Sequence, residues 1–203
     1  MNIFDIYYRD YEEWFEKHPE IYKAEIETIK ALLPKGEGFE VGVGSGRFAE
    51  PLGIKYGIEP SKNMAQIARK RGIEVLETTA EEMNFKEEFD YILMVTTICF
   101  VKDPLKTIQN CYKALKKGGY LLIAFVDLNS PLGKTYEKNK QKSKFYKEAI
   151  FFTKEDIINL MKKAGFKKFE CVENLYGDSL DNLKFEINEC NGGAFKVVRG
   201  KKI

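Results

Sequence analysis

The chain has 203 residues, of which 44% are hydrophobic and 13% aromatic, enough to build one sizeable core. Its 33 Lys and Arg residues nearly balance 31 Asp and Glu residues, and the net charge of +2 shows no electrostatic footprint for nucleic acid. No apolar run is long enough to span a bilayer, and the N-terminus is polar and aromatic, unlike a signal peptide. We therefore expect a cytoplasmic protein without a membrane partner.

The cysteines do not suggest a structural framework or a metal site. Cys99, Cys111, Cys171 and Cys190 show neither metal-ligand nor disulfide spacing, and His18 is the only histidine. We therefore expect no bound metal, and we place Cys111 in the core because it falls on the apolar face of a predicted helix.

Helix and strand alternate along most of the chain. The apolar spacing predicts a first helix over residues 3–16 and a second that stops at Pro34. Helices are expected to fill the gaps between the following strands, and one of them has an apolar face from Leu105 to Leu115. The first five strands are predicted near residues 38–41, 54–59, 73–76, 89–95 and 120–126.

The pattern loosens after Val126, through a loop and a lysine-rich segment. Helical spacing returns in a segment capped by Thr153 and ended by Gly165. Two last strands, near 166–175 and 194–199, are expected to form an antiparallel hairpin at the sheet edge. The elements predict an α/β fold: a doubly wound, seven-stranded, mostly parallel sheet with an antiparallel C-terminal edge strand, helices on both faces and an N-terminal helical cap.

The segment from Glu40 to Gly46 reads Glu-Val-Gly-Val-Gly-Ser-Gly, where a strand ends and a helix begins. Its glycines let the backbone turn sharply and approach a ligand, and the N–H groups that open the next helix favour an anionic group. Glu59 ends the next apolar run, beside this loop in a parallel sheet, where a carboxylate can accept hydrogen bonds from both hydroxyls of a ribose. Together these features predict a site for one nucleoside.

The glycine spacing helps to predict which chemical group is attached to the nucleoside. Dinucleotide folds use G-x-G-x-x-G, whereas this chain has G-x-G-x-G followed by Arg47 and Phe48. The spacing therefore disfavours NAD, although a plain tight turn between a strand and a helix would read similarly.

Five ordered motifs resemble those of the class I S-adenosylmethionine-dependent methyltransferases, in particular the small-molecule branch related to the ubiquinone-biosynthesis methyltransferases. The matching segments are residues 39–48, 57–61, 79–85, 89–92 and 103–121. The resemblance implies a single domain over 1–203, with a helical cap at 1–35, a cofactor-binding core at 36–126, a lid or substrate segment at 127–152, and a C-terminal helix and hairpin at 153–203.

This resemblance also implies an activity. A methyltransferase of this kind moves a methyl group from S-adenosyl-L-methionine to a small organic molecule by in-line displacement, and leaves S-adenosyl-L-homocysteine. The residues expected at the cofactor are Glu40, Gly42, Gly44, Gly46, Glu59, Pro60, Met64, Thr79, Ala80, Glu81, Met94 and Val95. Glu59 is expected on the ribose and Glu40 at the methionine end.

The chain departs from the family pattern at two positions. Thr79 stands where many relatives have Asp, so adenine recognition would depend on the Ala80 backbone, Glu81 or the Thr79 hydroxyl. Phe100 stands where many relatives have His, which removes an obvious proton acceptor. Asp127, just beyond the fifth strand, is then the best candidate for a general base, and the catalytic residues otherwise stay open.

Substrate-facing residues in such a fold come from the N-terminal helices and from the segment after the fifth strand. We expect Tyr7, Tyr11, Trp14, Phe100 and Tyr136 there, because aromatic rings stabilise a sulfonium and exclude water. The same rings could instead be ordinary packing. A nicotinamide-dependent oxidoreductase and a non-catalytic S-adenosylmethionine-binding regulator remain alternatives, and the methyl acceptor and the oligomeric state stay open.

Overall fold

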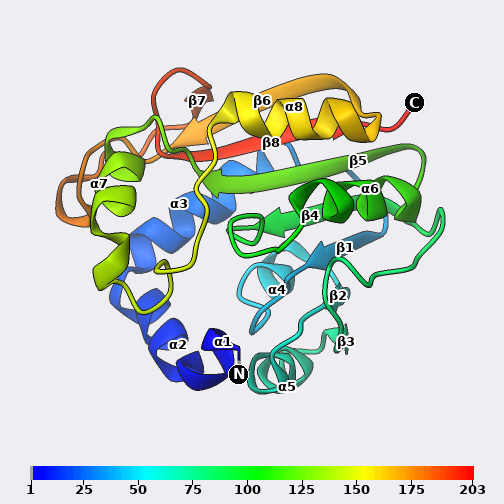
Figure 1. The fold of residues 1–203 in the computed structure, drawn as a ribbon, viewed down its shortest axis with the longest axis horizontal. Helices are drawn as coiled ribbons and strands as arrows, with labels where there is room; N and C mark the ends of the chain where they lie inside the picture. Colours follow the sequence, from blue (N-terminus) through cyan, green and yellow to red (C-terminus); the bar gives the residue numbers. More distant parts are fainter. Residues whose placement is uncertain (1) are drawn as a thin grey trace.

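Eight strands form one sheet in the order β3-β2-β1-β4-β5-β8-β6-β7 (Figure 1). The computed structural model describes residues 2–203. The strands are β1 (Gly38–Val41), β2 (Tyr56–Ile58), β3 (Glu74–Leu76), β4 (Phe89–Val95), β5 (Leu115–Val126), β6 (Lys167–Asn174), β7 (Asn188–Glu189) and β8 (Phe195–Lys201). Strands β3, β2, β1, β4 and β5 are mutually parallel, and β8 runs antiparallel to both β5 and β6.

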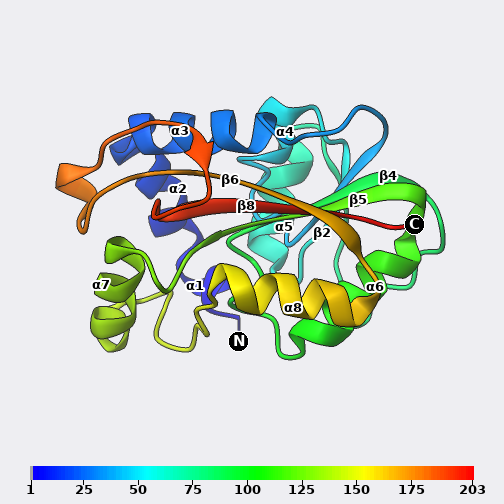
Figure 2. The same ribbon diagram turned by 90° about the horizontal axis from the view of Figure 1, so that it is seen from above.

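Helices cover both faces of this sheet (Figure 2). They are α1 (Ile3–Ile6), α2 (Tyr8–Lys17), α3 (Pro19–Lys30), α4 (Ala49–Leu52), α5 (Lys62–Lys70), α6 (Pro104–Ala114), α7 (Pro131–Asn139) and α8 (Lys154–Ala164). Local chemistry sets the ends of α8: Thr153 and Asp156 form a capping box at its start, and Gly165 ends it in the left-handed conformation. In residues 2–203, none of the helices is both long and apolar enough to cross a bilayer.

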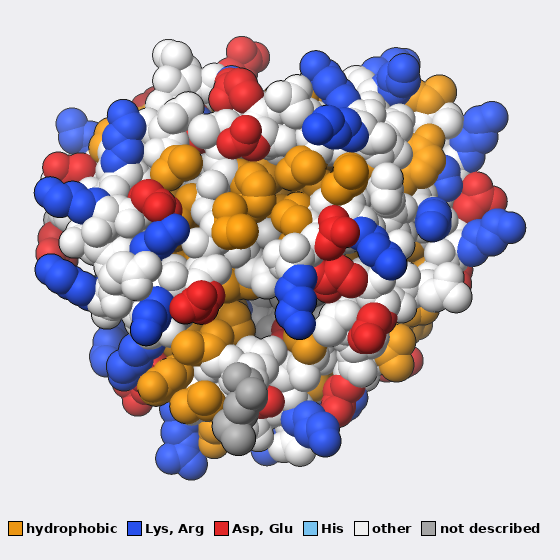
Figure 3. Space-filling view, in the orientation of Figure 1, with side chains coloured by type: hydrophobic (Ala, Val, Ile, Leu, Met, Phe, Trp, Pro, Cys, Tyr) orange, Lys and Arg blue, Asp and Glu red, His pale blue; other side chains and the backbone are white. Residues whose placement is uncertain are grey.

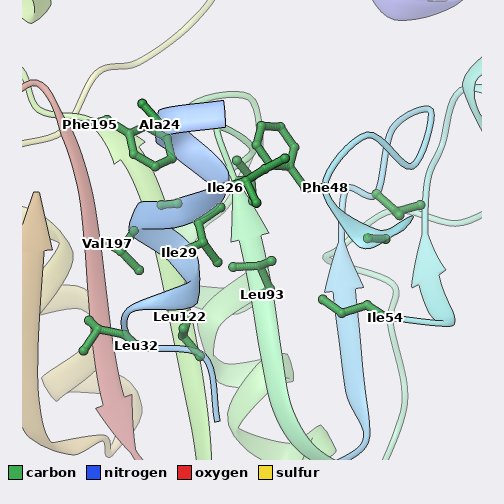
Figure 4. Close-up of a cluster of buried hydrophobic side chains, with 14 of the residues drawn as sticks. Ala24, Ile26, Ile29, Leu32, Phe48, Ile54, Leu93, Leu122, Phe195 and Val197 are labelled. Atoms are coloured by element: carbon green, nitrogen blue, oxygen red, sulfur yellow. The ribbon is translucent and has the colours of Figure 1, made fainter. Parts of the chain in front are cut away.

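Two buried clusters hold the layers together. On one face, Ala24, Ile26 and Ile29 of α3 and Leu32 in the turn after it pack against side chains of β4, β5 and β8, among them Leu93 (Figure 4). On the other face, α6 and α8 pack on the same central strands. Strand β4 is buried along nearly its whole length because helices cover it on both sides, which explains its continuous apolar run.

The α/β class, the mostly parallel sheet and the N-terminal helices are confirmed, and the end of the sheet differs in detail. The antiparallel C-terminal strand β8 lies between β5 and β6 instead of at the edge, and β7 adds an eighth strand. Burial explains the order, since β8 is buried along most of its length whereas both residues of β7 are exposed. An apolar strand gains more from the inner position.

Two helix predictions also need correction. The helix expected over residues 3–16 is broken at Tyr7 into α1 and α2, which lets α1 pack against α5 while α2 lies on the glycine loop. The connection from β3 to β4 forms turns instead of a helix over residues 77–88. The Asn110 side chain donates to the carbonyls of Ala80 and Glu81 and so holds this connection in place.

The prediction that the cysteines form no disulfide is wrong for one pair. Cys171 of β6 and Cys190 after β7 are bonded, with their Cα atoms 5.6 Å apart. The antiparallel register pairs Val172 with Glu189, so Cys171, just before Val172, faces Cys190, just after Glu189. The fold brings the two cysteines together, and their separation of 19 residues in the sequence does not predict the bond. Cys111 is fully buried, as predicted.

Candidate active site

The glycine loop connects β1 to α4 at the carboxyl edge of the sheet. Its three glycines all have a positive φ, which other residues disfavour, but their surroundings differ. A Cβ atom on Gly42 would lie 2.4 Å from Cγ2 of Thr97, and one on Gly46 would lie 2.5 Å from Cδ1 of Ile73, so the protein's own packing excludes side chains there. At Gly44 the nearest neighbours of a Cβ would be Cε of Met64 at 3.4 Å and Oη of Tyr11 at 3.6 Å. Of the three glycines, Gly44 is thus the one that faces the space under the N-terminal helices.

Glu59 lies beside this loop, as the sequence predicted, because β2 pairs in parallel with β1. The carboxylate is 6% exposed and accepts hydrogen bonds from the backbone N–H groups of Gly44, at 3.0 Å, and Ser61, at 2.9 Å. Burial raises the pKa of Glu59 to about 7, although these two hydrogen bonds oppose the rise. The oxygens keep lone pairs for further donors, which is the chemistry that a ribose diol requires.

Glu40, at β1, is 1% exposed, and its Oε2 atom has no hydrogen-bond partner within residues 2–203. Burial and the neighbouring charge of Glu59 hold the pKa of Glu40 well above its ordinary value, against the effect of the Ala49 backbone. An unsatisfied buried acceptor costs about 1–3 kcal/mol. A ligand that donates a hydrogen bond here would remove that cost, so the site fits a cofactor with an ammonium group.

The N-terminal helices are tied to the glycine loop by polar contacts. On α1, Asp5 accepts from the Ser61 hydroxyl at 2.5 Å and from the Asn63 N–H at 3.2 Å. On α2, Glu12 accepts from the side chains of Ser45, Arg47 and Arg71. These helices therefore lie over the site, and Figure 3 shows a hollow beside α1 with hydrophobic side chains along its border.

Tyr11 is the aromatic residue of this cover that lies beside Gly44, with its Oη 3.6 Å from where a Cβ atom on Gly44 would be. Its pKa is well above the ordinary value because of burial and then the charges of Glu40 and Glu59. Tyr11 therefore lies at the glycine loop, and its contact with a ligand stays a prediction. Trp14 instead packs against Phe15 and His18, away from the other predicted rings.

The end of β4 supplies a part that sequence reasoning missed. Met94 and Val95 are buried, as a strand end beneath the site requires. The next residue, Thr96, has a φ of +47°, which is strained for a β-branched side chain. The Thr97 hydroxyl then lies 3.1 Å from the Val95 carbonyl and 3.4 Å from the Gly42 carbonyl, between β4 and the glycine loop. The sequence signal for this strained turn was the pair of β-branched residues, Thr96 and Thr97, directly after a buried strand.

The turn predicted to hold adenine is fixed by the protein itself. Ala80 is buried, and the Thr79 hydroxyl donates to Glu82. The Glu81 carboxylate accepts from the backbone N–H groups of Lys102 and Asp103, at 2.7 and 3.1 Å, and so stabilises the start of α6. Both hydrogen bonds are made to Oε1 of Glu81, so its Oε2 can still accept, and the Ala80 backbone, Thr79 and Glu81 remain the candidates at this turn. Pro60 is exposed, and Met64 is buried beside Gly44.

Aromatic rings join the N-terminal helices to the segment after β5. The Phe100 ring lies 5.1 Å from that of Phe4 and 6.0 Å from that of Tyr146, which in turn stacks on Tyr136 at 5.3 Å. The predicted residues Phe100 and Tyr136 thus belong to one cluster. Tyr7 joins the cluster through Phe145, at 6.2 Å.

Asp127, the candidate base, lies at the other end of the same edge. It is buried, its Oδ2 lies 3.4 Å from Nζ of Lys196, and its Oδ1 accepts from the Asn129 N–H. Lys196 also pairs with the buried Glu173. Burial would raise the pKa of Glu173, but Lys196 and the backbone of residues 191–193 lower it to about 2. Asp127 therefore has partners of its own, and its role as a base gains no support.

Comparisons with known proteins agree with this geometry. The family model described as a methyltransferase domain matches residues 39–123. The crystal structure of a SAM-dependent methyltransferase from Thermotoga maritima, described as a possible histamine N-methyltransferase, is 51% identical, covers 99% of both chains and superposes with a TM-score of 0.96.

Two curated relatives extend the comparison. A protein of Methanocaldococcus jannaschii without an assigned function is 44% identical over the full length of both chains. The ubiquinone biosynthesis O-methyltransferase of Dinoroseobacter shibae is 26% identical over 63% of this chain and 58% of its own length.

These matches decide against the oxidoreductase alternative. They also identify S-adenosylmethionine as the nucleoside for which the glycine loop and Glu59 are suited. Taken with the loop, the two buried carboxylates and the cover of helices, they show that the chain belongs to the S-adenosylmethionine-dependent methyltransferases and is an enzyme.

Proposed function

We propose that this methyltransferase acts on a small organic molecule in the cytoplasm, by in-line displacement. The observation that carries the proposal is the double cover of the site: α1 and α2 on one side and the segment after β5 on the other, joined by the aromatic cluster around Phe4 and Phe145. An ion pair of 2.6 Å between Lys144 and Asp10 connects the same two segments. A site enclosed in this way suits a small acceptor better than a macromolecule.

We assign the cofactor contacts residue by residue. Glu59 would hold the ribose, Glu40 the ammonium of the methionine end, and the Ala80 backbone with Thr79 or Glu81 the adenine. Gly44, Met64 and the β4 end would form the walls. The cofactor supplies an activated methyl group when bound, so the protein's tasks are to align the acceptor and to exclude water. Tyr11 and the Phe4–Phe145 pair would exclude water.

The name of the Thermotoga relative, a possible histamine N-methyltransferase, supports an acceptor of small size. The test is a metabolite extract incubated with enzyme and S-adenosylmethionine that carries a labelled methyl group. We expect label in the low-molecular-mass fraction, and we expect Glu59→Ala, assayed in the same extract, to transfer much less. Label found only in protein or nucleic acid would contradict a small acceptor.

A further inference from the structure

Glu25 is a buried acidic residue in the middle of α3, where an apolar side chain would be expected. It shares the covered face of the helix with Ile21, Ala24, Thr28 and Ile29, and it is 7% exposed. Thr28, the other polar residue on that face, donates to the Ala24 carbonyl and accepts from Asn174. No donor or cation from residues 2–203 reaches the Glu25 carboxyl group, and burial alone raises its pKa to about 8.

The surroundings of Glu25 are aromatic and come from both covers of the site. Tyr11 and Tyr136 pack against the same hydrophobic cluster as Ile21 and Ala24 of α3, and the charge of Glu25 contributes to the raised pKa values of Tyr136, Tyr146 and Tyr11. Tyr136 and Tyr146 are stacked at 5.3 Å, and Tyr146 lies 5.4 Å from Phe151. Glu25 thus lies beside the acceptor side of the aromatic cluster, whereas Glu40 and Glu59 lie at the glycine loop on the cofactor side.

We propose that Glu25 binds a positively charged amine group of the methyl acceptor, which makes the acceptor an amine. The proposal rests on the proposed function, since it assumes a small acceptor. A carboxylate buried without a donor is costly, and an ammonium group would supply both the missing donor and the missing charge. The tyrosine rings would add cation–π attraction at a desolvated site. An alcohol could hydrogen-bond to the protonated carboxyl group, but it would bring no positive charge to favour the carboxylate form, and an acidic acceptor would oppose that form.

The proposal has a thermodynamic signature. The free Glu25 carboxyl group holds its proton at neutral pH, because its pKa is raised to about 8. When an ammonium group binds, the carboxylate form is favoured, and the proton leaves for the solvent. Binding of a cationic amine at pH 7 should therefore release close to one proton, whereas binding of the corresponding alcohol should release none.

The experiment is calorimetry in the presence of S-adenosylhomocysteine, with a series of primary amines from ethylamine to 2-phenylethylamine and the alcohol counterpart of each. We expect amines to bind at least about tenfold more tightly than their alcohols, the lower end of the range for a hydrogen bond to a charged group. Titrations in buffers of different ionisation enthalpy count the released proton.

Glu25→Gln is the informative variant, since it keeps shape and removes charge, and Glu27→Gln, on the exposed side of the same helix, is the matched control. We expect Glu25→Gln to lose the amine preference and the proton release while it keeps its affinity for S-adenosylhomocysteine and for the alcohols. Glu27→Gln should behave as the wild type. If Glu25→Gln does not fold, the amine preference and the proton release measured on the wild type still test the proposal.

Equal binding of amines and alcohols by the wild type, or an unchanged amine preference in folded Glu25→Gln, would overturn the proposal. The experiment with the labelled metabolite extract distinguishes the role of Glu25 from the small-acceptor function. Label on a small molecule without a basic nitrogen would refute the role of Glu25 and leave the small-acceptor function intact, whereas label only on macromolecules would refute both.

Discussion

Two groups of buried carboxylates lie at the carboxyl edge of this sheet, and they differ in what surrounds them. Asp127 and Glu173, at the ends of β5 and β6, share the ammonium group of Lys196. Glu40 has an oxygen without a partner, and Glu25 has no partner for its carboxyl group among the described residues. The pKa of Glu173 is lowered to about 2, whereas that of Glu25 is raised to about 8.

We infer from this difference that one group of carboxylates stabilises the fold and the other binds ligands. A buried charge that the protein balances by itself serves stability or uniqueness of the fold, and it loses little when ligands are absent. A buried carboxyl group without a partner weakens the free protein and is compensated only when a ligand arrives. The paired group therefore reads as structural and the unpaired group as the binding site, and the predictions below test this division.

The largest expected effect is on the paired group. Lys196→Met would leave Glu173 and Asp127 buried without a cation, so we expect the free energy of unfolding to fall by about 3–5 kcal/mol. Lys201→Met, farther along the same strand, is the control and should change it by less than about 1 kcal/mol. Urea denaturation measures both. A loss as small as that of the control would show that the group does not stabilise the fold.

The second largest effect on stability is expected from the disulfide next to the paired group. Cys190→Ser removes the bond to Cys171, which closes a loop of 19 residues, and should lower the free energy of unfolding by about 3 kcal/mol. The same loss should appear in wild-type protein treated with a reductant. Cys111→Ser is not a useful control, because Cys111 is buried in the core, so the comparison is between oxidised and reduced wild type. No difference between these two forms would argue against a formed disulfide.

Glu59 belongs to the binding side, because it has backbone donors but no cation among the described residues, so the expected effect there is on ligand affinity. Glu59→Ala removes the predicted ribose acceptor, and we expect the affinity for S-adenosylhomocysteine to fall by about 1.5–3 kcal/mol, the range for hydrogen bonds to a charged group. Calorimetry measures it, and Glu74→Ala, an exposed strand residue nearby, is the control. Unchanged affinity in a folded variant would remove Glu59 from the site.

The smallest effect concerns pH. The pKa values of Glu25 and Glu59 are raised in the folded protein, to about 8 and about 7, so the native state binds more protons than the unfolded state above pH 4.5. The stability of the free protein should therefore fall as the pH rises from about 4.5 to 8. Glu25→Gln should reduce this fall by about 1 kcal/mol, less than the full shift implies, because water entering the site relaxes the penalty. An identical pH profile in the variant would contradict the raised pKa.

Local patterns predicted the cofactor side of the site from the sequence. The glycine loop and Glu59 follow two neighbouring strands, and the parallel pairing of β1 with β2 is enough to bring them together. The family resemblance added the positions of Met94 and Val95. The helices could be predicted where caps and apolar spacing agree, as in α8.

The proposed acceptor side could not be predicted in the same way, because it depends on contacts between distant segments. Glu25 looks like an ordinary charge on a surface helix until its position on the covered face is known, although its spacing of four from both Ile21 and Ile29 was a signal. The partners of Asp127 and of Cys171 come from β8 and from the residue after β7, and the order of these strands decides them.

The central claim is that the buried carboxylates without a cation among the described residues, Glu25, Glu40 and Glu59, form the ligand site. A crystal structure with S-adenosylhomocysteine tests it most directly. We predict the ribose hydroxyls within hydrogen-bond distance of Glu59, the ligand's ammonium group at Oε2 of Glu40, directly or through one water, and an unchanged group of Asp127, Lys196 and Glu173. A ligand bound away from Glu59, or an Oε2 atom of Glu40 that still lacks a partner in the complex, would contradict the account.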